Sequence, residues 1–124
     1  MPVIDFDAQR EYDDERFAAH GVFRSDRTKV VCGFFEPGQF IPVHAPDSDV
    51  VVSVRSGTGR VREGETDHAV EPGDVVVVAA GTARGVEADD DARLEALLVT
   101  APPPTDAEHD PVRKGLREGE FEPE

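Results

Sequence analysis

His44 lies in a segment whose composition suits chemistry at a binding site. It stands between Pro42 and Pro46 in "FIPVHAP", and the two prolines disfavour both a helix and a paired central strand. A histidine in such an extended segment can bind a metal, act as a general base or donate a hydrogen bond to a bound molecule. A structural histidine, hydrogen-bonded within the fold, is the alternative interpretation.

Few other side chains extend this chemistry. Asp47 and Asp49 offer oxygen ligands beside His44, but Asp49 has the opposite strand parity, so a shared metal site requires a backbone shift. Solvation of an acidic loop explains both aspartates as well. The only cysteine, Cys32, excludes an intramolecular disulfide and a Cys-based zinc cluster, and we expect it to be a buried thiol. His109 is expected to be structural or at the surface.

Short strands must position these side chains. From Gly21 onward the sequence has seven or eight strand-like runs separated by Gly or Pro, among them "KVVCGFF", "DVVVSV", "DVVVVAA" and "LEALLVT". This pattern is typical of an antiparallel sandwich or small barrel. Because "VVVSV" and "VVVV" are apolar on both faces, we expect a second sheet on one face and a partner subunit on the other, in a homodimer.

The charge excludes several classes of partner. Asp and Glu total 27 against 13 Lys and Arg, a formal net charge of −14, and only two of the cations are lysines. Such a surface repels phosphate backbones and anionic lipids, so we expect no nucleic-acid or membrane role. The composition resembles that of proteins from salt-accumulating halophiles. We expect a cytoplasmic protein, because no apolar stretch reaches the roughly 20 residues that span a bilayer and no leader-like segment is present.

The chain is expected to have one domain with two flanking segments. Residues 1–19 form an acidic N-terminal arm, residues 20–101 the barrel, and residues 102–124 a Pro-rich, acidic C-terminal extension. In that extension Thr105 and Glu108 have the spacing of a helix capping box, whereas Pro111 and Gly115 keep any helix short or broken.

The turns between the strands coincide with a known family. The chain from about Val30 to Thr100 resembles a small cupin, an all-β double-stranded β-helix, or jelly-roll barrel. Gly38, then "QFIPV", then His44, with Gly57 closing the stretch, follow the spacing of the first cupin motif. Gly73, "DVVVV", and "AAGTAR" ending at Arg84 follow the spacing of the second.

The resemblance breaks down at the metal ligands. Cupins hold a metal with two histidines and a glutamate from the first motif and one histidine from the second. Those positions here are His44, Pro46, Val50 and Arg84, of which only His44 is a ready ligand. Arg84 is a fixed cation that repels a metal but suits a carboxylate or phosphate. We therefore expect a degenerate metal site and no cofactor.

The primary hypothesis is a metal-independent module that binds or senses a small anionic or polar molecule in the barrel. His44 and Arg84 would supply the polar contacts, and an apolar wall would come from Val50, Val52, Val54, Val76 and Val78. The first alternative is a cupin enzyme (an isomerase, epimerase, lyase or dioxygenase-like protein) using His44 with a rebuilt metal site. The second alternative is a non-catalytic dimeric scaffold.

Overall fold

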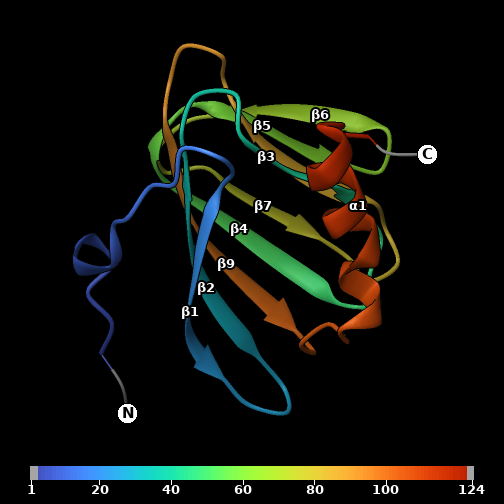
Figure 1. Cartoon of the computed structure of the whole chain (residues 1–124). Helices are drawn as coiled ribbons and strands as arrows, with labels where there is room; N and C mark the ends of the chain where they lie inside the picture. The colour runs from blue at the N-terminus through green and yellow to red at the C-terminus, as the bar shows by residue number, and fades with distance from the viewer. Residues whose placement is uncertain (1–2, 123–124) are drawn as a thin grey trace.

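Two antiparallel β-sheets face each other in this computed structural model, which describes residues 3–122 (Figure 1). The nine strands are β1 (Ala18–Arg24), β2 (Lys29–Phe35), β3 (Phe40–His44), β4 (Asp49–Gly57), β5 (Gly59–Glu63), β6 (Thr66–Val70), β7 (Val75–Val78), β8 (Arg84–Ala88) and β9 (Leu94–Ala101). The helical elements are two 3-10 turns, η1 (Asp7–Gln9) and η2 (Ala107–His109), and one α-helix, α1 (Asp110–Glu118). The prediction of an all-β jelly roll with a short helical or irregular C-terminal extension is confirmed, and the extension contains a helix.

One of these strands is formed by the extended segment whose prolines argued against a central strand. β3 contains Pro42, and it lies at the edge of the four-stranded sheet, whose order is β3-β8-β5-β6. An edge strand has one row of backbone groups without a strand partner, so a missing N–H there does not break a ladder. The N–H of Val43 instead donates to the carbonyl of Phe121 at 2.7 Å.

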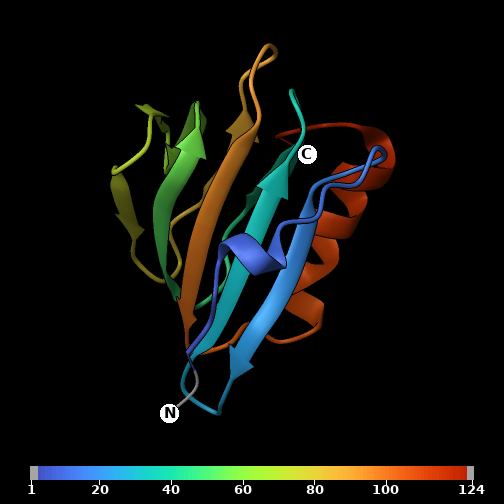
Figure 2. The same cartoon turned by 90° about the vertical axis from the view of Figure 1, so that its left-hand side faces the viewer.

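The larger sheet has the strand order β1-β2-β9-β4-β7 (Figure 2). Every strand pair in both sheets is antiparallel. Alternate residues of β4 enter the space between the sheets, where Val50, Val52 and Val54 are at most 6% exposed. Each fully buried side chain of this size contributes about 1.5–3 kcal/mol to the hydrophobic driving force. The period-two pattern therefore fixes which face of each strand forms the core.

At Gly57, one of the glycines of the first cupin motif, the backbone geometry requires a residue without a side chain. This residue ends β4 with φ of 79°, a conformation that side chains disfavour. A Cβ at this position would lie 1.7 Å from the carbonyl oxygen of Arg93, so the two chain segments can approach only at a glycine.

The two ends of the chain pack on different parts of the barrel. At the N-terminal end, Phe6 and Tyr12 pack against Phe34 on the outer face of the larger sheet. At the other end, α1 packs against β3, where Gly115 lies against Pro42. β1 begins at Ala18 and β9 ends at Ala101. Residues 1–2 and 123–124, which belong to the expected terminal segments, lie outside the described residues.

None of the described helices is both long enough and apolar enough to cross a bilayer.

Candidate functional site

A cavity of about 170 Å³ opens between the two sheets at the end of the barrel where the C-terminal segment begins. Its walls are mostly apolar side chains from both sheets, among them Phe17, Val31, Ile41 and Leu98. Its polar lining comes from Lys29, His44, Arg84, Thr100 and His109. A mostly apolar pocket with a few converging polar groups is the usual form of a small-molecule site.

Arg84 is the most deeply buried charged residue at this cavity, at 6% exposed. It is the first residue of β8, and its Nε and Nη2 groups hold the preceding turn. Nη2 donates to the carbonyls of Ala79 at 2.9 Å and Thr82 at 3.1 Å, and Nε donates to Thr82 at 3.2 Å. Nη1 is buried and has no hydrogen-bond partner within the protein. Burial lowers the pKa of Arg84, although an arginine stays charged in proteins.

An unpaired N–H on a buried guanidinium is unfavourable. Leaving a buried donor unsatisfied costs about 1–3 kcal/mol, and more when the group is charged. Native structures contain few such groups, and each calls for a specific explanation, such as a ligand that supplies the acceptor. Here the unsatisfied donor is Nη1 of Arg84, a residue that lines the cavity.

His44, the last residue of β3, is directly opposite Arg84 in the strand pairing. Its Nδ1 lies 2.9 Å from the carbonyl oxygen of Pro42. A carbonyl can only accept, so Nδ1 carries the proton, and in the neutral ring Nε2 is the nitrogen with a lone pair. Burial lowers the pKa of His44, and the charges of Arg84 and His109 act in the same direction. The backbone carbonyls of Pro42 and Arg84 oppose this shift but are outweighed.

His109 joins the site from the C-terminal segment. It lies in η2 and lines the cavity together with Lys29 of β2. Burial lowers the pKa of His109, and the positive charges of Lys29 and Arg113 add to the effect. From the sequence, His109 was predicted to be structural or at the surface. No local signal places it at the cavity, because its position depends on the path of the C-terminal extension.

The lining is positive in a strongly negative protein. Among its described residues are Lys29 and Arg84, two histidines, and no aspartate or glutamate. The chain as a whole has 27 acidic residues against 13 basic ones. An apolar, positively charged site in such a protein concentrates anions and disfavours cations.

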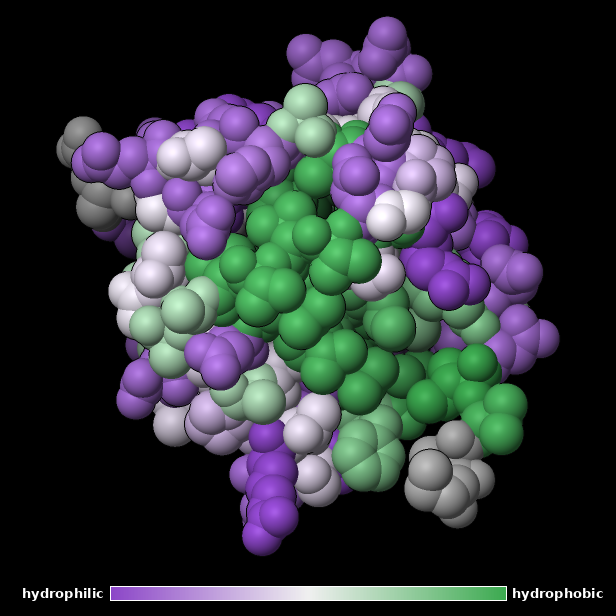
Figure 3. All heavy atoms as spheres, turned by 180° about the vertical axis from the view of Figure 1, so that it is seen from behind, coloured by the Kyte–Doolittle hydropathy of each residue, from purple (hydrophilic) through white to green (hydrophobic). Residues whose placement is uncertain are grey.

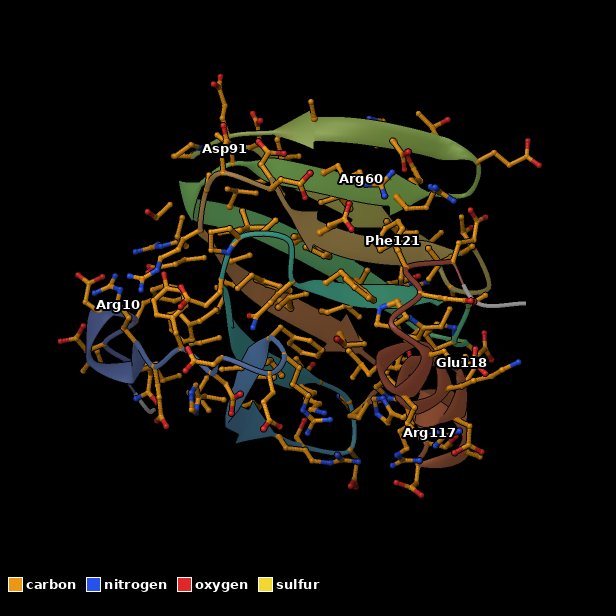
Figure 4. All side chains as sticks on the ribbon, turned by 45° about the horizontal axis from the view of Figure 1, so that its top comes forward. Arg10, Arg60, Asp91, Arg117, Glu118 and Phe121 are labelled. Carbon is orange, nitrogen blue, oxygen red and sulfur yellow. The ribbon has the colours of Figure 1, made fainter. Side chains whose placement is uncertain are left out.

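Several contacts hold the C-terminal segment in place. Glu108 accepts from the backbone N–H of Asp47 at 2.6 Å and from that of Thr105 at 2.9 Å, which confirms the expected capping interaction. Further along the chain, the guanidinium carbon of Arg60 lies over the ring of Phe121, 4.3 Å from the ring centroid. This contact is on the outer side of the smaller sheet (Figure 4). The segment is therefore a fixed wall of the site.

The structure brings only part of the predicted site together. His44, Arg84, Val50 and Val52 line the cavity. Val54 and Val78 are instead buried in the core away from it, and Val76 packs against that core. The predicted apolar wall thus included residues of β4 and β7 that do not line the cavity. Strand parity predicts which face of the sheet a side chain is on, but not how deep in the barrel it lies.

The side chains at the family's metal positions do not fit a metal. Pro46 and Val50 carry no donor atoms, and the cation of Arg84 stands opposite the single imidazole of His44. A divalent metal needs about three or four donors. Asp49 accepts from the backbone N–H of Ala80 at 2.8 Å, and the cavity lining does not include it or Asp47. Within residues 3–122, no group of three or more His, Cys, Asp or Glu side chains is placed to hold a metal ion.

Comparison with known proteins agrees with this architecture. The family model described as "Cupin domain" matches residues 34–100. The crystal structure of TT1209 from Thermus thermophilus has a TM-score of 0.80 and 32% sequence identity, over 84% of this chain and 100% of that chain. An RmlC-like cupin protein from Desulfovibrio desulfuricans has a TM-score of 0.73 and 29% identity, over 83% and 98% of the two chains.

The chain belongs to the cupin domain family. A third structure, the polyketide cyclase RemF from Streptomyces resistomycificus, has a TM-score of 0.69 at 15% identity, over 84% of this chain and 81% of that chain. This likeness shows a shared fold alone. No curated protein matches the sequence.

Proposed function

We propose that this cupin binds a compact organic anion, such as a monocarboxylate with an apolar body, without the help of a metal. The observation that carries the proposal is the unpaired, buried Nη1 of Arg84 in the wall of an apolar cavity. A carboxylate oxygen supplies the acceptor that this donor lacks, and the described lining contains no aspartate or glutamate that an anion would contact.

The geometry of Arg84 restricts how the anion binds. Nε and Nη2 are already engaged by the carbonyls of Ala79 and Thr82. A bidentate pairing along the Nε–Nη2 edge would break those bonds, so we expect the ligand to accept from Nη1 alone. This arrangement holds one oxygen and leaves the rest of the ligand to the apolar walls.

The cavity volume limits the body of the ligand. An apolar cavity of about 150 Å³ is known to hold benzene, and the cavity here has about 170 Å³. A single six-membered ring or a branched aliphatic group of similar size therefore fits beside the carboxylate. The proposed role is binding or sensing of such an acid.

Calorimetric titration with three probes tests this proposal. Benzoate has the expected shape and charge, benzamide has the same shape without the charge, and inorganic phosphate has charge without the apolar body. We expect benzoate to bind at least about tenfold more tightly than either control, because one charge-assisted hydrogen bond is worth about 1.5–3 kcal/mol. Equal binding of benzoate and benzamide would contradict the role of charge, and equal binding of phosphate would contradict the apolar body.

Arg84→Met is the matched variant for this titration. It keeps an apolar stem in the wall and removes the donor, so we expect benzoate affinity to fall about tenfold or more. Because Arg84 also holds the turn at Ala79 and Thr82, circular dichroism and thermal melting must first establish that the variant is folded. Elemental analysis giving about one metal per chain, lost in His44→Gln, would overturn metal independence.

A second candidate function rests on the tautomer of His44. A neutral ring whose Nε2 is an acceptor, beside a cationic guanidinium, suits a general base acting on a bound acid. Nε2 would take a proton from the carbon next to a carbonyl whose oxygen Arg84 holds, and the same carbon of the enolate would then take back a proton that has exchanged with solvent. Proton NMR of 2-oxo acids in D₂O tests this: His44-dependent deuterium exchange would support an isomerase-type enzyme.

A further inference from the structure

Two basic residues lie side by side on the inner face of the larger sheet. Lys29, the first residue of β2, is paired with Arg24, the last residue of β1. Directly paired residues have their side chains on the same face of a sheet, and Lys29 lines the cavity, so Arg24 is on the cavity's side as well. Their sequence neighbours Phe23 and Val30 form a pair on the opposite, outer face, which is broadly hydrophobic (Figure 3).

The two basic residues belong to a row that ends at the cavity. Lys29 is also paired with Thr100 of β9, and Thr100 is paired with Val50 of β4. Both Thr100 and Val50 line the cavity. Arg84 lines it from β8, a strand of the other sheet. The cavity therefore has a cationic side chain on each of the two sheets that enclose it.

The cations on the two sheets differ in depth. Arg84 is 6% exposed, whereas Lys29 is partly exposed and Arg24 is exposed. We call Arg24 and Lys29 together the basic rim. His109 lies within electrostatic range of this rim, because burial lowers its pKa and the charge of Lys29 adds to the effect. The positive potential thus extends from the interior of the cavity to the surrounding solvent.

No described carboxylate neutralises the basic rim. Like charges directly opposed on neighbouring strands are destabilising. Within residues 3–122, neither Arg24 nor Lys29 forms an ion pair with an aspartate or glutamate. The chain has 27 acidic residues to choose from, so their absence here is not a matter of supply. An anion from solution would relieve the repulsion.

The carboxylates that flank His109 are engaged elsewhere. Asp106 and Asp110 both pair with Arg113, at 2.6 Å and 2.9 Å. Glu108 accepts hydrogen bonds from two backbone N–H groups. The C-terminal segment therefore brings three acidic side chains close to the cavity without placing any of them in its lining. The basic rim keeps its charge for a ligand.

We propose that the basic rim is a second anion subsite, and that the ligand of this cupin is a small dicarboxylic acid with an apolar body between its two carboxylates. This inference rests on the proposed function, in which Nη1 of Arg84 holds the first carboxylate. The apolar body fills the cavity, and the second carboxylate lies at the solvent-facing side, where Lys29 and Arg24 attract it and the hydroxyl of Thr100 can donate a hydrogen bond.

Calorimetric titration with pairs of matched acids tests the second subsite. Isophthalate and terephthalate carry two carboxylates on one ring, and their monoamides, 3- and 4-carbamoylbenzoate, have the same size with one carboxylate. At low salt we expect at least one dicarboxylate to bind about fivefold or more tightly than its own monoamide, since each partly exposed ion pair contributes only modestly. Benzoate is titrated alongside to measure the first subsite.

Lys29→Met is the variant that tests the rim itself. It keeps an apolar stem and removes the charge, so we expect the advantage of the dicarboxylate over its monoamide to fall to about twofold or less. Arg24→Met should reduce the same ratio by a smaller amount. Arg117→Met is the matched control, because it removes one positive charge from an exposed position of α1 that does not line the cavity. Its ratio should equal that of the wild-type chain.

The outcomes separate this inference from the proposed function. If benzoate binds and Arg84→Met weakens it, but no dicarboxylate binds more tightly than its monoamide, the second subsite alone is overturned. Equal ratios in Lys29→Met and Arg117→Met would also overturn it. If neither benzoate nor any dicarboxylate binds, both proposals are overturned.

A measurement on the wild-type chain decides the case if Lys29→Met fails to fold. Salt screens solvent-exposed charges more strongly than buried ones, so the advantage of the dicarboxylate over its monoamide should shrink as KCl rises to 1 M. An advantage that stays constant over this range would place the second carboxylate away from the basic rim and would overturn the assignment.

Discussion

His44 and Arg84 are directly opposed across the β3–β8 pair, so a neutral imidazole and a fixed cation share one wall of the cavity. Burial keeps the pKa of His44 below its usual range, and the charge of Arg84 acts in the same direction. The pair thus combines a permanent positive charge with a group that accepts a proton only when an anion or a lower pH favours it.

We predict that His44 makes the free energy of unfolding depend on pH. Because its folded-state pKa is lowered from about 6.5, the unfolded chain binds this proton more readily than the folded chain. The full stability is present above the unfolded pKa and declines as the pH falls toward the folded-state pKa. The slope from one histidine is at most about 1.4 kcal/mol per pH unit.

Urea unfolding at a series of pH values, for the wild-type chain and His44→Gln, measures this dependence. Gln keeps a polar side chain but does not titrate. The difference between the two slopes of unfolding free energy against pH therefore gives the contribution of His44. His109, whose pKa is also lowered, and the carboxylates contribute a background that both chains share. Identical slopes in the two chains would contradict the prediction.

The sequence allowed the fold to be predicted because its signals are local. Gly57 and Gly73 mark turns with positive φ, and the alternation within "DVVVSV" assigns Val50 and Val52 to the inner face. The segment Phe40–His44 was predicted to be extended and not a central strand, and its pairing as an edge strand could not be predicted from Pro42 alone. Edge position is a property of the whole sheet and cannot be seen in a short segment.

The candidate site was less predictable because it depends on depth and on distant contacts. The spacing of the cupin motifs placed His44 opposite Arg84, but nothing local shows that Val78 is buried in the core and outside the cavity lining. The contribution of His109 depends on the path of a segment that follows "PPP". That path is fixed by contacts such as Glu108 to the backbone N–H of Asp47, which join residues 61 positions apart.

We predict that Gly57→Ala severely destabilises the fold, whereas Gly73→Ala has a moderate effect. Both glycines have positive φ, but a Cβ at Gly57 would lie 1.7 Å from the carbonyl oxygen of Arg93, and a Cβ at Gly73 would meet nothing within 4 Å. The Gly73 variant should lose about 1–2 kcal/mol of unfolding free energy, the cost of a left-handed conformation with a side chain. Chemical denaturation of both variants measures this, and equal losses would contradict the steric explanation.

We predict that Arg10 anchors the N-terminal arm through the buried carboxylate of Glu95. Arg10 donates to Glu95 from Nε at 2.6 Å and from Nη2 at 2.8 Å, and the Tyr12 hydroxyl also donates to it. These interactions lower the pKa of Glu95, with Arg10 as the largest cause. Arg10→Ala leaves a carboxylate that is 5% exposed without its charged partner, so we expect the variant to unfold more easily than the wild-type chain.

Thermal melting and limited proteolysis of Arg10→Ala test this anchor. The arm should become the first site of cleavage, because its backbone then lacks a strong contact with β9. Arg117→Ala on α1 (Figure 4) is the control, since removal of an exposed arginine should change stability by no more than about 0.5 kcal/mol. Because the pKa of Glu95 is lowered, the contribution of Arg10 should disappear as the pH falls through that pKa. A loss that stays constant down to strongly acidic pH would contradict this assignment.

We predict that the stability of this chain rises from low salt to molar KCl. Repulsion among 27 acidic side chains opposes the compact state, and 13 basic ones offset less than half of them. The screening length falls from about 10 Å at 0.1 M salt to about 3 Å at 1 M, which is shorter than most distances between surface charges. A gain of about 1 kcal/mol would raise the melting temperature by about 4 °C in a domain of 124 residues.

The turn between β8 and β9 supplies the matched variant for this measurement. Asp90→Asn with Asp91→Asn removes two exposed carboxylates from a run of three, so the melting temperature should start higher at low salt and rise less with KCl. An uncharged osmolyte at the same concentration separates screening from the general exclusion of solutes. If the melting temperature is flat or falls as KCl increases, the resemblance to halophile proteins has no basis in the stability of this chain. If it rises equally in both chains, screening of these carboxylates is not the cause.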